Sequence, residues 1–514
     1  MSAASTLLNQ ASRSLQAGAL AEAEVNLRQI LSQEPNNADA LNLLGVVAMR
    51  AGKTAAGAEL FQRARALAPR NVEIHNNLAT ALALLKRTNE ALDIATAAAT
   101  LDPHNADTQE ILGNILMDQS NFFSAIAAYE RGVKLKPNAA MNHQNLGRAL
   151  AITDDLQRSV AAFEKAVALD PNSVEVLFQL GSSLYELGEI DRAIECFQKA
   201  IALNPGHAAS HWNRGQALLL KGDLARGWPE FDWRMKIPAL NLSPTHLRRP
   251  LWDGGNVDGQ TILLYSEQGF GDTLQFSRYI PIVADKGAKV VFACSPSLLN
   301  LIRQSQPRAT VFSNLAAPPR FDVFCPLPSL PRAFDTTIET IPANIPYITA
   351  DATRIDAWRN RLAGESRLKI GLAWAGSPLH TNDRRRSLPP AALAPLSEAT
   401  NAAFYNMQLE KEPDPGIPLI DWTNALQNFS DTAALIANLD LIISVDTAVA
   451  HLAGAMGKPV WLLLPFVPDW RWMLAREDSP WYPTMRLFRQ PRRHDWETPI
   501  RQIAAELAQF GNPR

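Results

Sequence analysis

Six prolines recur at a fixed interval in the first half of the chain. Each stands 34 residues after the one before, and 34 residues is the length of one common helix–turn–helix repeat unit. A proline ends a helix, because it cannot donate the next backbone hydrogen bond and it restricts the residue before it. The interval therefore predicts an array of paired helices closed by Pro35, Pro69, Pro103, Pro137, Pro171 and Pro205.

Other positions of the repeat keep the same phase, counted from three residues after each proline. Position 8 is small throughout: Gly45, Ala79, Gly113, Gly147, Gly181 and Gly215. Position 20 is also small: Gly57, Ala91, Ala125, Ser159, Ala193 and Gly227. Small residues are expected where two helices cross closely. Position 24 is large in all but one unit, and we expect it to fill the space between neighbouring units: Phe61, Ala95, Tyr129, Phe163 and Phe197.

This pattern resembles the tetratricopeptide repeat over residues 4 to about 236. Six units are complete, and a partial seventh departs from the pattern after Gly227. Stacked units of this kind build a superhelix, whose concave surface usually binds an extended or helical segment of another protein. The first half of the chain is therefore expected to bind a protein or peptide partner.

Position 6 of the repeat suggests what lines that surface. Primary amides donate and accept hydrogen bonds, so a ladder of them can hold a peptide backbone. Leu43 and Ile111 break the series, and asparagine is ordinary at this position of the repeat, so a purely structural role is the alternative. The candidate peptide-binding residues are Asn77, Asn145, Gln179 and Asn213.

Composition adds several expectations about location and partners. A chain of 514 residues is long enough for about three domains. The net charge of −2 gives no reason to expect nucleic acid or an acidic membrane surface as a partner. No stretch resembles a signal-peptide core or a membrane span. We expect a cytoplasmic protein, whose widely spaced cysteines are reduced packing residues: Cys196, Cys294 and Cys325.

The residue pattern changes after the repeats, from helical periodicity to strands that alternate with helices. Proline, glycine and polar residues without a stable period predict a connector over residues 237–258. Apolar strands then alternate with helices: TILLYS (261–266) is followed by a helix over TLQFSRYIPIVADKG and by the strand AKVVFACS, and a second series starts at LKIGLAWAG (368–376). Such alternation predicts βαβ units with parallel sheets. We predict tetratricopeptide repeats over 1–236 and two α/β Rossmann-type domains over 259–362 and 363–514, with a cleft between these two.

The segment Glu267-Gln268-Gly269-Phe270-Gly271-Asp272 follows the first of these strands. Its glycines let the backbone turn tightly and approach a ligand closely. Asp272 falls near the first turn of the following helix, where a carboxylate can accept a proton from an acceptor hydroxyl. The alternative is that Asp272 only caps this helix, which would stabilise it by about 1 kcal/mol.

The segment SVDTAVAHLAGAMGKPVW runs from a strand directly into a helix. Asp446 and Thr447 lie at the junction, and His451 follows four residues after Thr447 on the same helix face. A helix N-terminus offers free N–H groups and a partial positive charge, which suit a diphosphate. The structural alternative is a capping Asp446 and a hydrogen-bonded core His451.

Two further segments are rich in arginine or tryptophan. Arg384, Arg385 and Arg386 precede Ser-Leu-Pro-Pro, which predicts a helix start, and guanidinium groups there would suit a phosphate. A solvated basic loop is the alternative. In the segment after Pro468 we expect the tryptophans to pack a core or a domain seam and to bind no ligand: Trp470, Trp472 and Trp481.

Together these segments resemble the ADP-heptose:lipopolysaccharide heptosyltransferases, inverting glycosyltransferases of the two-domain GT-B architecture. The resemblance covers about residues 260–510. In that family a Gly-Asp pair opens the first helix and supplies the catalytic base, and here Gly271 and Asp272 match it. A basic residue holds phosphate beside Trp-Pro in the family; Arg385 or Arg386 before Ser-Leu-Pro is an approximate match. The family also has a segment Asp-[Ser/Thr]-Gly-x-x-His-Leu-Ala that binds the diphosphate of the nucleotide sugar. In this chain its matching residues are Asp446, Thr447, His451, Leu452 and Ala453. Ala448 stands where the family has glycine.

The layout also resembles a recurrent bacterial type in which tetratricopeptide repeats precede a transferase-like half, and it is similar to that of the O-GlcNAc protein transferases. The resemblance implies a sugar transferred from a nucleotide-diphosphate donor with inversion, with no cofactor and no catalytic metal. It implies Asp272 as the base. It implies donor contacts from Gly271, Arg385, Arg386, Asp446, Thr447 and His451.

Three functions remain open at this point. The first is a glycosyltransferase whose repeats recruit a protein acceptor. The second is a glycosyltransferase acting on a glycolipid or polysaccharide precursor. The third is a non-catalytic repeat scaffold with a degenerate transferase half, which Ala448 and the loose arginine motif favour. Fold-level similarity does not separate these three functions.

Overall fold

A computed structural model describes residues 3–510 except 243, 245, 268, 379–382 and 409–414. The chain forms two compact units. The first contains Met1–Leu187 with Ala202–Asn204, and the second contains Gly188–Ile201 with Pro205–Arg514. The last repeat helices therefore pack with the α/β half, and each unit is described by itself below.

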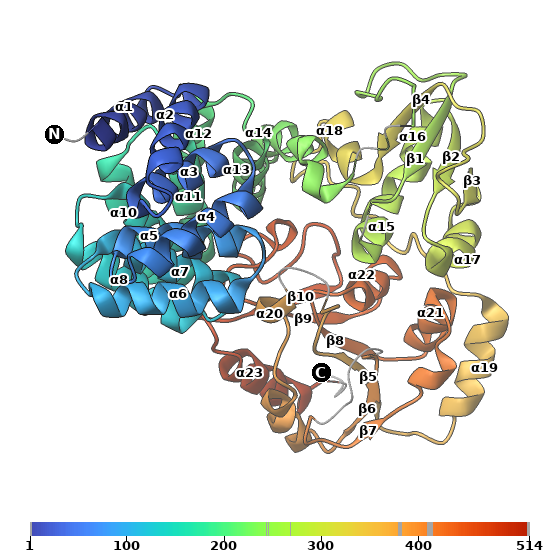
Figure 1. Cartoon of the computed structure of the whole chain (residues 1–514). Coiled ribbons are helices and arrows are strands. Elements are labelled where there is room, and N and C mark those ends of the chain that lie inside the picture. Colours follow the sequence, from blue (N-terminus) through green and yellow to red (C-terminus); the bar gives the residue numbers. More distant parts are fainter. Residues whose placement is uncertain are drawn as a thin grey trace. The chain divides into compact units, whose positions relative to one another are not determined.

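The first unit is an array of antiparallel helix pairs (Figure 1). These helices and the repeat helices at the start of the second unit confirm the predicted tetratricopeptide array. Its helices are α1 (Ala3–Gln16), α2 (Leu20–Gln33), α3 (Ala38–Arg50), α4 (Thr54–Leu67), α5 (Val72–Leu84), α6 (Thr88–Leu101), α7 (Ala106–Asp118), α8 (Phe122–Leu135), α9 (Ala140–Ile152), α10 (Leu156–Leu169) and α11 (Val174–Leu187).

An asparagine two residues after a proline starts several of these pairs. The side chain of Asn37 accepts a hydrogen bond from the Ala40 N–H at 2.9 Å, and that of Asn105 accepts one from Thr108 at 3.0 Å. Asn71 caps α5 in the same way. Each cap satisfies a backbone donor that the helix leaves unpaired, which is worth about 1 kcal/mol. Proline ends one helix and asparagine begins the next, so the period is built into local chemistry.

The aromatic residue at position 24 lies over the glycine at position 8 of its own unit. A Cβ atom added to Gly113 would lie 2.5 Å from the Tyr129 ring, and one added to Gly45 would lie 2.5 Å from the Phe61 ring. The rings therefore also pack within their own unit, and Phe61 and Tyr129 belong to a core cluster that continues through neighbouring units. Where position 24 is Ala95, position 8 is an alanine as well, because no ring then needs the space.

We expect Gly113→Ala to destabilise the first unit by about 1–3 kcal/mol, because the new methyl group overpacks against Tyr129. Gly132→Ala is the matched control: its added Cβ meets only ordinary contacts at 3.6 Å or beyond in α8. Alanine there should be neutral or stabilising, by up to about 1 kcal/mol. Urea unfolding of both variants measures this, and equal effects of the two substitutions would contradict the packing argument.

The second unit begins with most of α12 (Ile190–Leu203), followed by α13 (Ala208–Leu220), α14 (Leu224–Phe231) and the 3₁₀ turn η1 (Asp232–Lys236). The Trp228 indole N–H on α14 donates to the Thr336 carbonyl at 2.8 Å. Its ring meets the Trp470 ring edge-on, with centroids 5.3 Å apart. Trp470, Trp472 and Trp481 are buried, as expected, and the last two repeat helices are part of the same core.

The first sheet of this unit has four parallel strands in the order β3-β2-β1-β4. The single helix predicted after β1 is divided into α15, a 3₁₀ turn and α16, since Pro281 starts a new helix at a position where no N–H is needed. The elements are β1 (Thr261–Tyr265), α15 (Phe270–Phe276), α16 (Ile280–Asp285), β2 (Lys289–Ala293), α17 (Pro296–Ser305), β3 (Ala309–Phe312), β4 (Val323–Pro326), α18 (Leu330–Ala333) and α19 (Ala352–Leu362).

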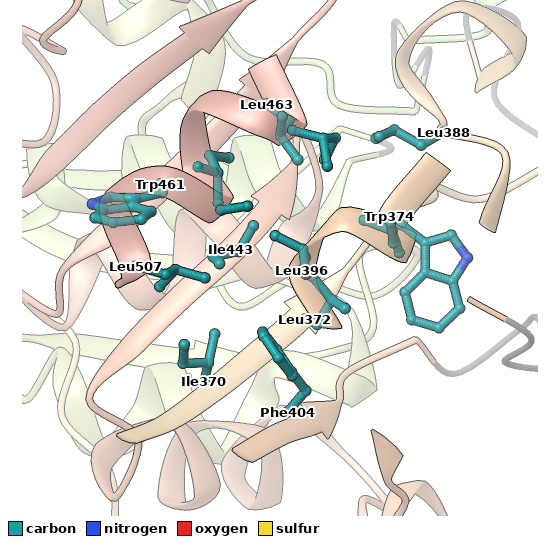
Figure 2. Packing of buried hydrophobic residues seen from close by; sticks show 14 of the residues in the cluster. Ile370, Leu372, Trp374, Leu388, Leu396, Phe404, Ile443, Trp461, Leu463 and Leu507 are labelled. Atoms are coloured by element: carbon teal, nitrogen blue, oxygen red, sulfur yellow. The ribbon is translucent and has the colours of Figure 1, made fainter. Parts of the chain in front are cut away.

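The second sheet has six parallel strands in the order β10-β9-β8-β5-β6-β7. Figure 2 shows its core, where Leu372, Ile443 and Leu463 of neighbouring strands pack with Leu396 and Leu507. The predicted α/β fold is confirmed. The elements are β5 (Leu368–Ala373), α20 (Asp383–Arg386), the 3₁₀ helix η5 (Pro390–Glu398), β6 (Ala402–Asn406), β7 (Leu419–Ile420), α21 (Phe429–Ala437), β8 (Leu441–Val445), α22 (Ala448–Ala455), β9 (Val460–Leu464), the 3₁₀ turn η7 (Trp470–Trp472), β10 (Met485–Arg489) and α23 (Glu497–Leu507).

None of the helices in the described part of the chain combines the length and the hydropathy that crossing a bilayer requires.

Candidate functional site

Asp272 lies in the first turn of α15, directly beyond the carboxyl end of β1. Gly269, not Asp272, is the N-cap residue, and no side chain caps this helix. The alternative that Asp272 serves as the helix cap is therefore wrong. Its carboxylate is about a third exposed, at 36 %, so it is accessible to a reacting group.

The guanidinium of Arg471, in η7 after β9 of the second sheet, holds this carboxylate. Arg471 Nη2 donates to Asp272 Oδ1 at 2.5 Å, and Arg471 Nε donates to Gln275 Oε1 at 2.7 Å on the same helix. Its remaining nitrogen, Nη1, contacts Asp469 Oδ1 at 2.9 Å. Each guanidinium nitrogen thus has its own acceptor. Arg471 is only 8 % exposed, which makes this a fixed part of the site.

Asp446, Thr447 and His451 lie where β8 passes into α22, as the sequence predicted for a strand-to-helix junction. Thr447 is the N-cap residue, and its hydroxyl pairs with Ser444 Oγ at 2.9 Å. The side chain of Asp446 is buried beneath the helix start, whereas Thr447 and Ala448 remain partly exposed. The first residues of α22, whose backbone N–H groups have no acceptor within the helix, thus lie at a partly exposed position.

Both ring nitrogens of His451 are engaged. Nε2 lies 3.4 Å from Asp446 Oδ1, and Nδ1 lies 2.9 Å from Tyr482 Oη. Burial raises the pKa of Tyr482 well above its usual value, so this phenol keeps its proton and donates to Nδ1. The Nε2–H then donates to Asp446, and a single neutral tautomer satisfies both contacts.

The charges of this pair follow from burial and from each other. Burial lowers the pKa of His451, although Asp446 opposes the shift. Burial alone would raise the pKa of Asp446, but the contact with His451 and the charge of Arg471 hold the pKa below its usual range. The pair at neutral pH is an aspartate ion beside an uncharged imidazole. In this conformation His451 positions Asp446 and supplies no positive charge of its own.

Helices α15 and α22 lie side by side, although they follow strands of different sheets (Figure 1). The close approach depends on Gly271. A Cβ atom added there would lie 2.7 Å from His451 Cδ2, inside the contact distance of two carbon atoms. The predicted residues Gly271, Asp272, Asp446, Thr447 and His451 are thus brought together from segments about 170 residues apart.

The arginine segment reaches the same junction through one side chain. Arg386 Nη1 donates to the backbone carbonyl of Asp446 at 2.9 Å, which puts a cation beside the start of α22. Arg385 is half-buried. The sequence predicted that this segment is a loop before a helix. It is instead a single helical turn, α20, in which Asp383 accepts a hydrogen bond from the Ser387 hydroxyl at 2.8 Å. The element that follows is a 3₁₀ helix. Asn382, the first residue of the basic segment Asn382–Ser387, lies outside the described residues.

Two residues of the site were missed by the sequence analysis: Asp469 and Arg471. Burial, followed by the charge of Asp446, raises the pKa of Asp469 to about 6, against the effect of Arg471. Three aspartates thus surround one arginine at this point. The sequence did contain a signal for them: Asp469 and Arg471 are charged residues in an otherwise apolar, tryptophan-rich segment. Charged side chains that are buried in such a segment need polar partners.

The amides at repeat position 6 bond to neighbouring repeat residues. Asn77 Nδ2 donates to Asn42 Oδ1 at 2.9 Å, and Asn145 Nδ2 lies 3.5 Å from Glu110 Oε1. Gln179 bonds Glu175 and Gln144, and Asn213 bonds Gln216. These bonds extend from one unit to the next or along one helix. Whether the amides also hold a peptide stays a prediction.

Two expectations remain outside these observations. The sequence also predicts that the loop after FYNMQLE (404–410) and the start of NFSDTAALI (428–436) border a nucleotide base, and residues 409–414 lie outside the described residues. Across the rest of the chain, no group of three or more His, Cys, Asp or Glu side chains is arranged to hold a metal ion. A transfer without metal or cofactor stays a prediction.

Family models match both halves of the chain. Tetratricopeptide models match residues 14–76, 47–106, 112–174, 162–195 and 181–222. The model described as glycosyltransferase family 9 (heptosyltransferase) matches residues 426–463. That short match includes Asp446, Thr447 and His451 but neither Asp272 nor the arginine segment. The chain carries tetratricopeptide repeats through its N-terminal half and a glycosyltransferase-type segment near its C-terminus.

One curated relative matches part of the chain. Protein FlbA of Caulobacter vibrioides is 26 % identical over 323 residues, which are 57 % of this chain and 54 % of that protein. The match thus spans about half the length of this relative.

Solved structures resemble part of the chain. YrrB, a TPR protein with an unusual peptide-binding site, is 23 % identical, covering 35 % of this chain and 94 % of that one, with a TM-score of 0.33. PilF of Pseudomonas aeruginosa is 22 % identical over 40 % and 94 % of the two chains, with a TM-score of 0.38. MamA is 25 % identical over 32 % and 90 %, with a TM-score of 0.31.

Proposed function

We propose that this protein is an inverting glycosyltransferase that moves a sugar from a nucleotide-diphosphate donor to an acceptor hydroxyl. One observation carries the proposal: an accessible carboxylate, Asp272, lies on α15, which packs against α22 of the second sheet. Catalysis by displacement needs this pairing, a base on one side of the reacting carbon and a site for the leaving group on the other.

The diphosphate is proposed to bind at the N-terminus of α22. Thr447 and Ala448 at this helix start are partly exposed residues, the hydroxyl of Thr447 is adjacent, and Arg386 adds a cation through its contact with the Asp446 carbonyl. These groups would stabilise the negative charge that develops on the leaving diphosphate. His451 and the Asp446 carboxylate do not contact the diphosphate in this proposal. They hold the backbone in place where β8 passes into α22.

Asp272 is proposed to take the proton. The acceptor oxygen attacks the anomeric carbon as the bond from that carbon to the diphosphate oxygen breaks, and the hydroxyl proton passes to the carboxylate. Arg471 occupies Oδ1, and Oδ2 has no hydrogen-bond partner among the described residues, so Oδ2 is the atom that receives the proton. A single displacement of this kind inverts the anomeric centre.

A protein is the proposed acceptor, because tetratricopeptide repeats suggest binding of a protein or peptide. The sugar and the nucleotide base are left to the experiment. A glycolipid or polysaccharide acceptor would give the same donor chemistry with a different acceptor, so the donor is the part to test first.

A thermal-shift panel of ADP, UDP, GDP and CDP with their common sugar conjugates tests the donor site. We expect one nucleotide to raise the melting temperature of the full chain; a ligand present at 100 times its Kd contributes about 2.7 kcal/mol. Arg386→Gln should lose most of this effect, since it removes the cation beside α22. Arg359→Gln, at an exposed position on α19, is the control and should keep it.

If no nucleotide in the panel raises the melting temperature, the proposed donor site is contradicted and a non-catalytic scaffold is favoured. An equal response in wild type and Arg386→Gln would keep a nucleotide site but move it away from α22.

A further inference from the structure

The chain contains two Asp-Trp-Arg segments that make the same internal ion pair, although Asp232 has a helical backbone and Asp469 an extended one. Asp232-Trp233-Arg234 lies in η1, after the last repeat helix, and Asp469-Trp470-Arg471 lies at η7, between β9 and β10. In each turn the arginine pairs with the aspartate two residues before it. The distances are 2.7 Å for Arg234–Asp232 and 2.9 Å for Arg471–Asp469.

The two arginines bind opposite ends of one glycine loop. Arg234 contacts the Glu267 carboxylate through Nη2 at 2.7 Å and through Nε at 3.0 Å. Arg471 holds Asp272, five residues further along, at 2.5 Å. The loop between them contains Gly269 and Gly271, which have no side chains and leave the backbone more conformational freedom than other residues would.

Burial makes both contacts strong and specific. Arg234 is 2 % exposed, and it also donates to Ser329 Oγ at 2.9 Å, which in turn donates to Asp232 Oδ1 at 2.6 Å. Arg471 spans Asp272, Asp469 and Gln275 with separate nitrogens. A planar fork can bind three acceptors in this way, whereas the single ammonium group of a lysine cannot reproduce it.

We propose that these two turns form a clamp on the glycine loop, in which Arg234 and Arg471 are positioning residues and Arg471 orients the carboxylate of Asp272 for proton transfer. The part that concerns proton transfer rests on the proposed function. The clamp itself does not, because it concerns only the order of the loop. One consequence is that the last repeat pair, through η1, fixes one end of the catalytic loop.

Amide hydrogen exchange of the full chain tests the clamp without any assay of transfer. Arg471→Lys and Arg234→Lys keep the charge and so limit the damage to folding. We expect each to speed exchange of the amides of residues 266–276 about tenfold or more, with exchange in the sheets unchanged. Arg308→Lys, in an exposed ion pair with Asp285, is the matched control and should change nothing in this loop. Unchanged loop exchange in both clamp variants would overturn the proposal.

Steady-state kinetics test the orientation of Asp272. Arg471→Lys should lower kcat about tenfold or more and leave the donor KM within about twofold, because the diphosphate site lies elsewhere. In an Asp272→Asn background the same substitution should cost nothing further, since both changes act through one group. Equal losses in both backgrounds would overturn the positioning role. A wild-type chain that transfers no sugar would contradict the proposed function, while the exchange result would still decide the clamp.

Discussion

Asp272→Asn is expected to lower the transfer rate by about 10²- to 10⁴-fold, the range that a general base contributes. The amide has the shape of the carboxylate and can still meet Arg471, but it cannot accept the acceptor proton. This change does not touch the proposed donor site at α22. Donor affinity in a thermal-shift titration should therefore stay within a few-fold of wild type.

The matched control is Asp285→Asn, at an exposed aspartate of α16, which precedes β2 of the same sheet. It should leave the transfer rate and the donor affinity unchanged. If donor affinity falls in Asp272→Asn as much as the rate does, Asp272 is a binding residue and the proton must go to another group. Asp469 would then be the next carboxylate to test, because it shares Arg471 with Asp272.

Gly271→Ala is expected to be the most damaging one-carbon change in the site. The new methyl group would lie 2.7 Å from the His451 ring, which Tyr482 and Asp446 hold on its two nitrogens. Overpacking of this kind costs about 1–3 kcal/mol of folding free energy. If α15 moves by about 1 Å to relieve the contact, misplacement of Asp272 should cost roughly 10²-fold in rate. Urea unfolding and the transfer assay measure the two effects separately.

Gly364→Ala provides the comparison, since an added Cβ there meets no atom within 4 Å and its backbone conformation is ordinary. This variant should match wild type in stability and in rate. A Gly271→Ala protein that keeps wild-type stability would mean that His451 moves aside easily and that the contact between α15 and α22 is loose.

Much of the fold was predictable because it depends on short-range patterns. The prolines end helices, and Asn37, Asn71 and Asn105 begin the next ones through local hydrogen bonds. Apolar strands that alternate with helices predict parallel sheets from local texture alone. The error over residues 273–287 has a local cause too: Pro281 was included in one continuous helix, although it favours a new start.

The candidate site was predictable only in part. The two motifs around Asp272 and Asp446 were found because each has its own residue pattern at a strand end. Their juxtaposition depends on Gly271 meeting His451, a packing relation that no local pattern contains. The charge state of His451 was also hidden, since it follows from burial and from Tyr482, 31 residues further along the chain.

Local sequence patterns were enough to predict the repeat array, the two parallel sheets and the motifs around Asp272 and Asp446, because each depends on hydrogen bonding and periodicity within a few residues. The tertiary structure alone decided which group holds the proposed base. Arg471 lies 199 residues from Asp272, and their contact exists only because two separately formed sheets bring their strand ends to one place. A buried charge requires a partner, but only packing selects which one it has.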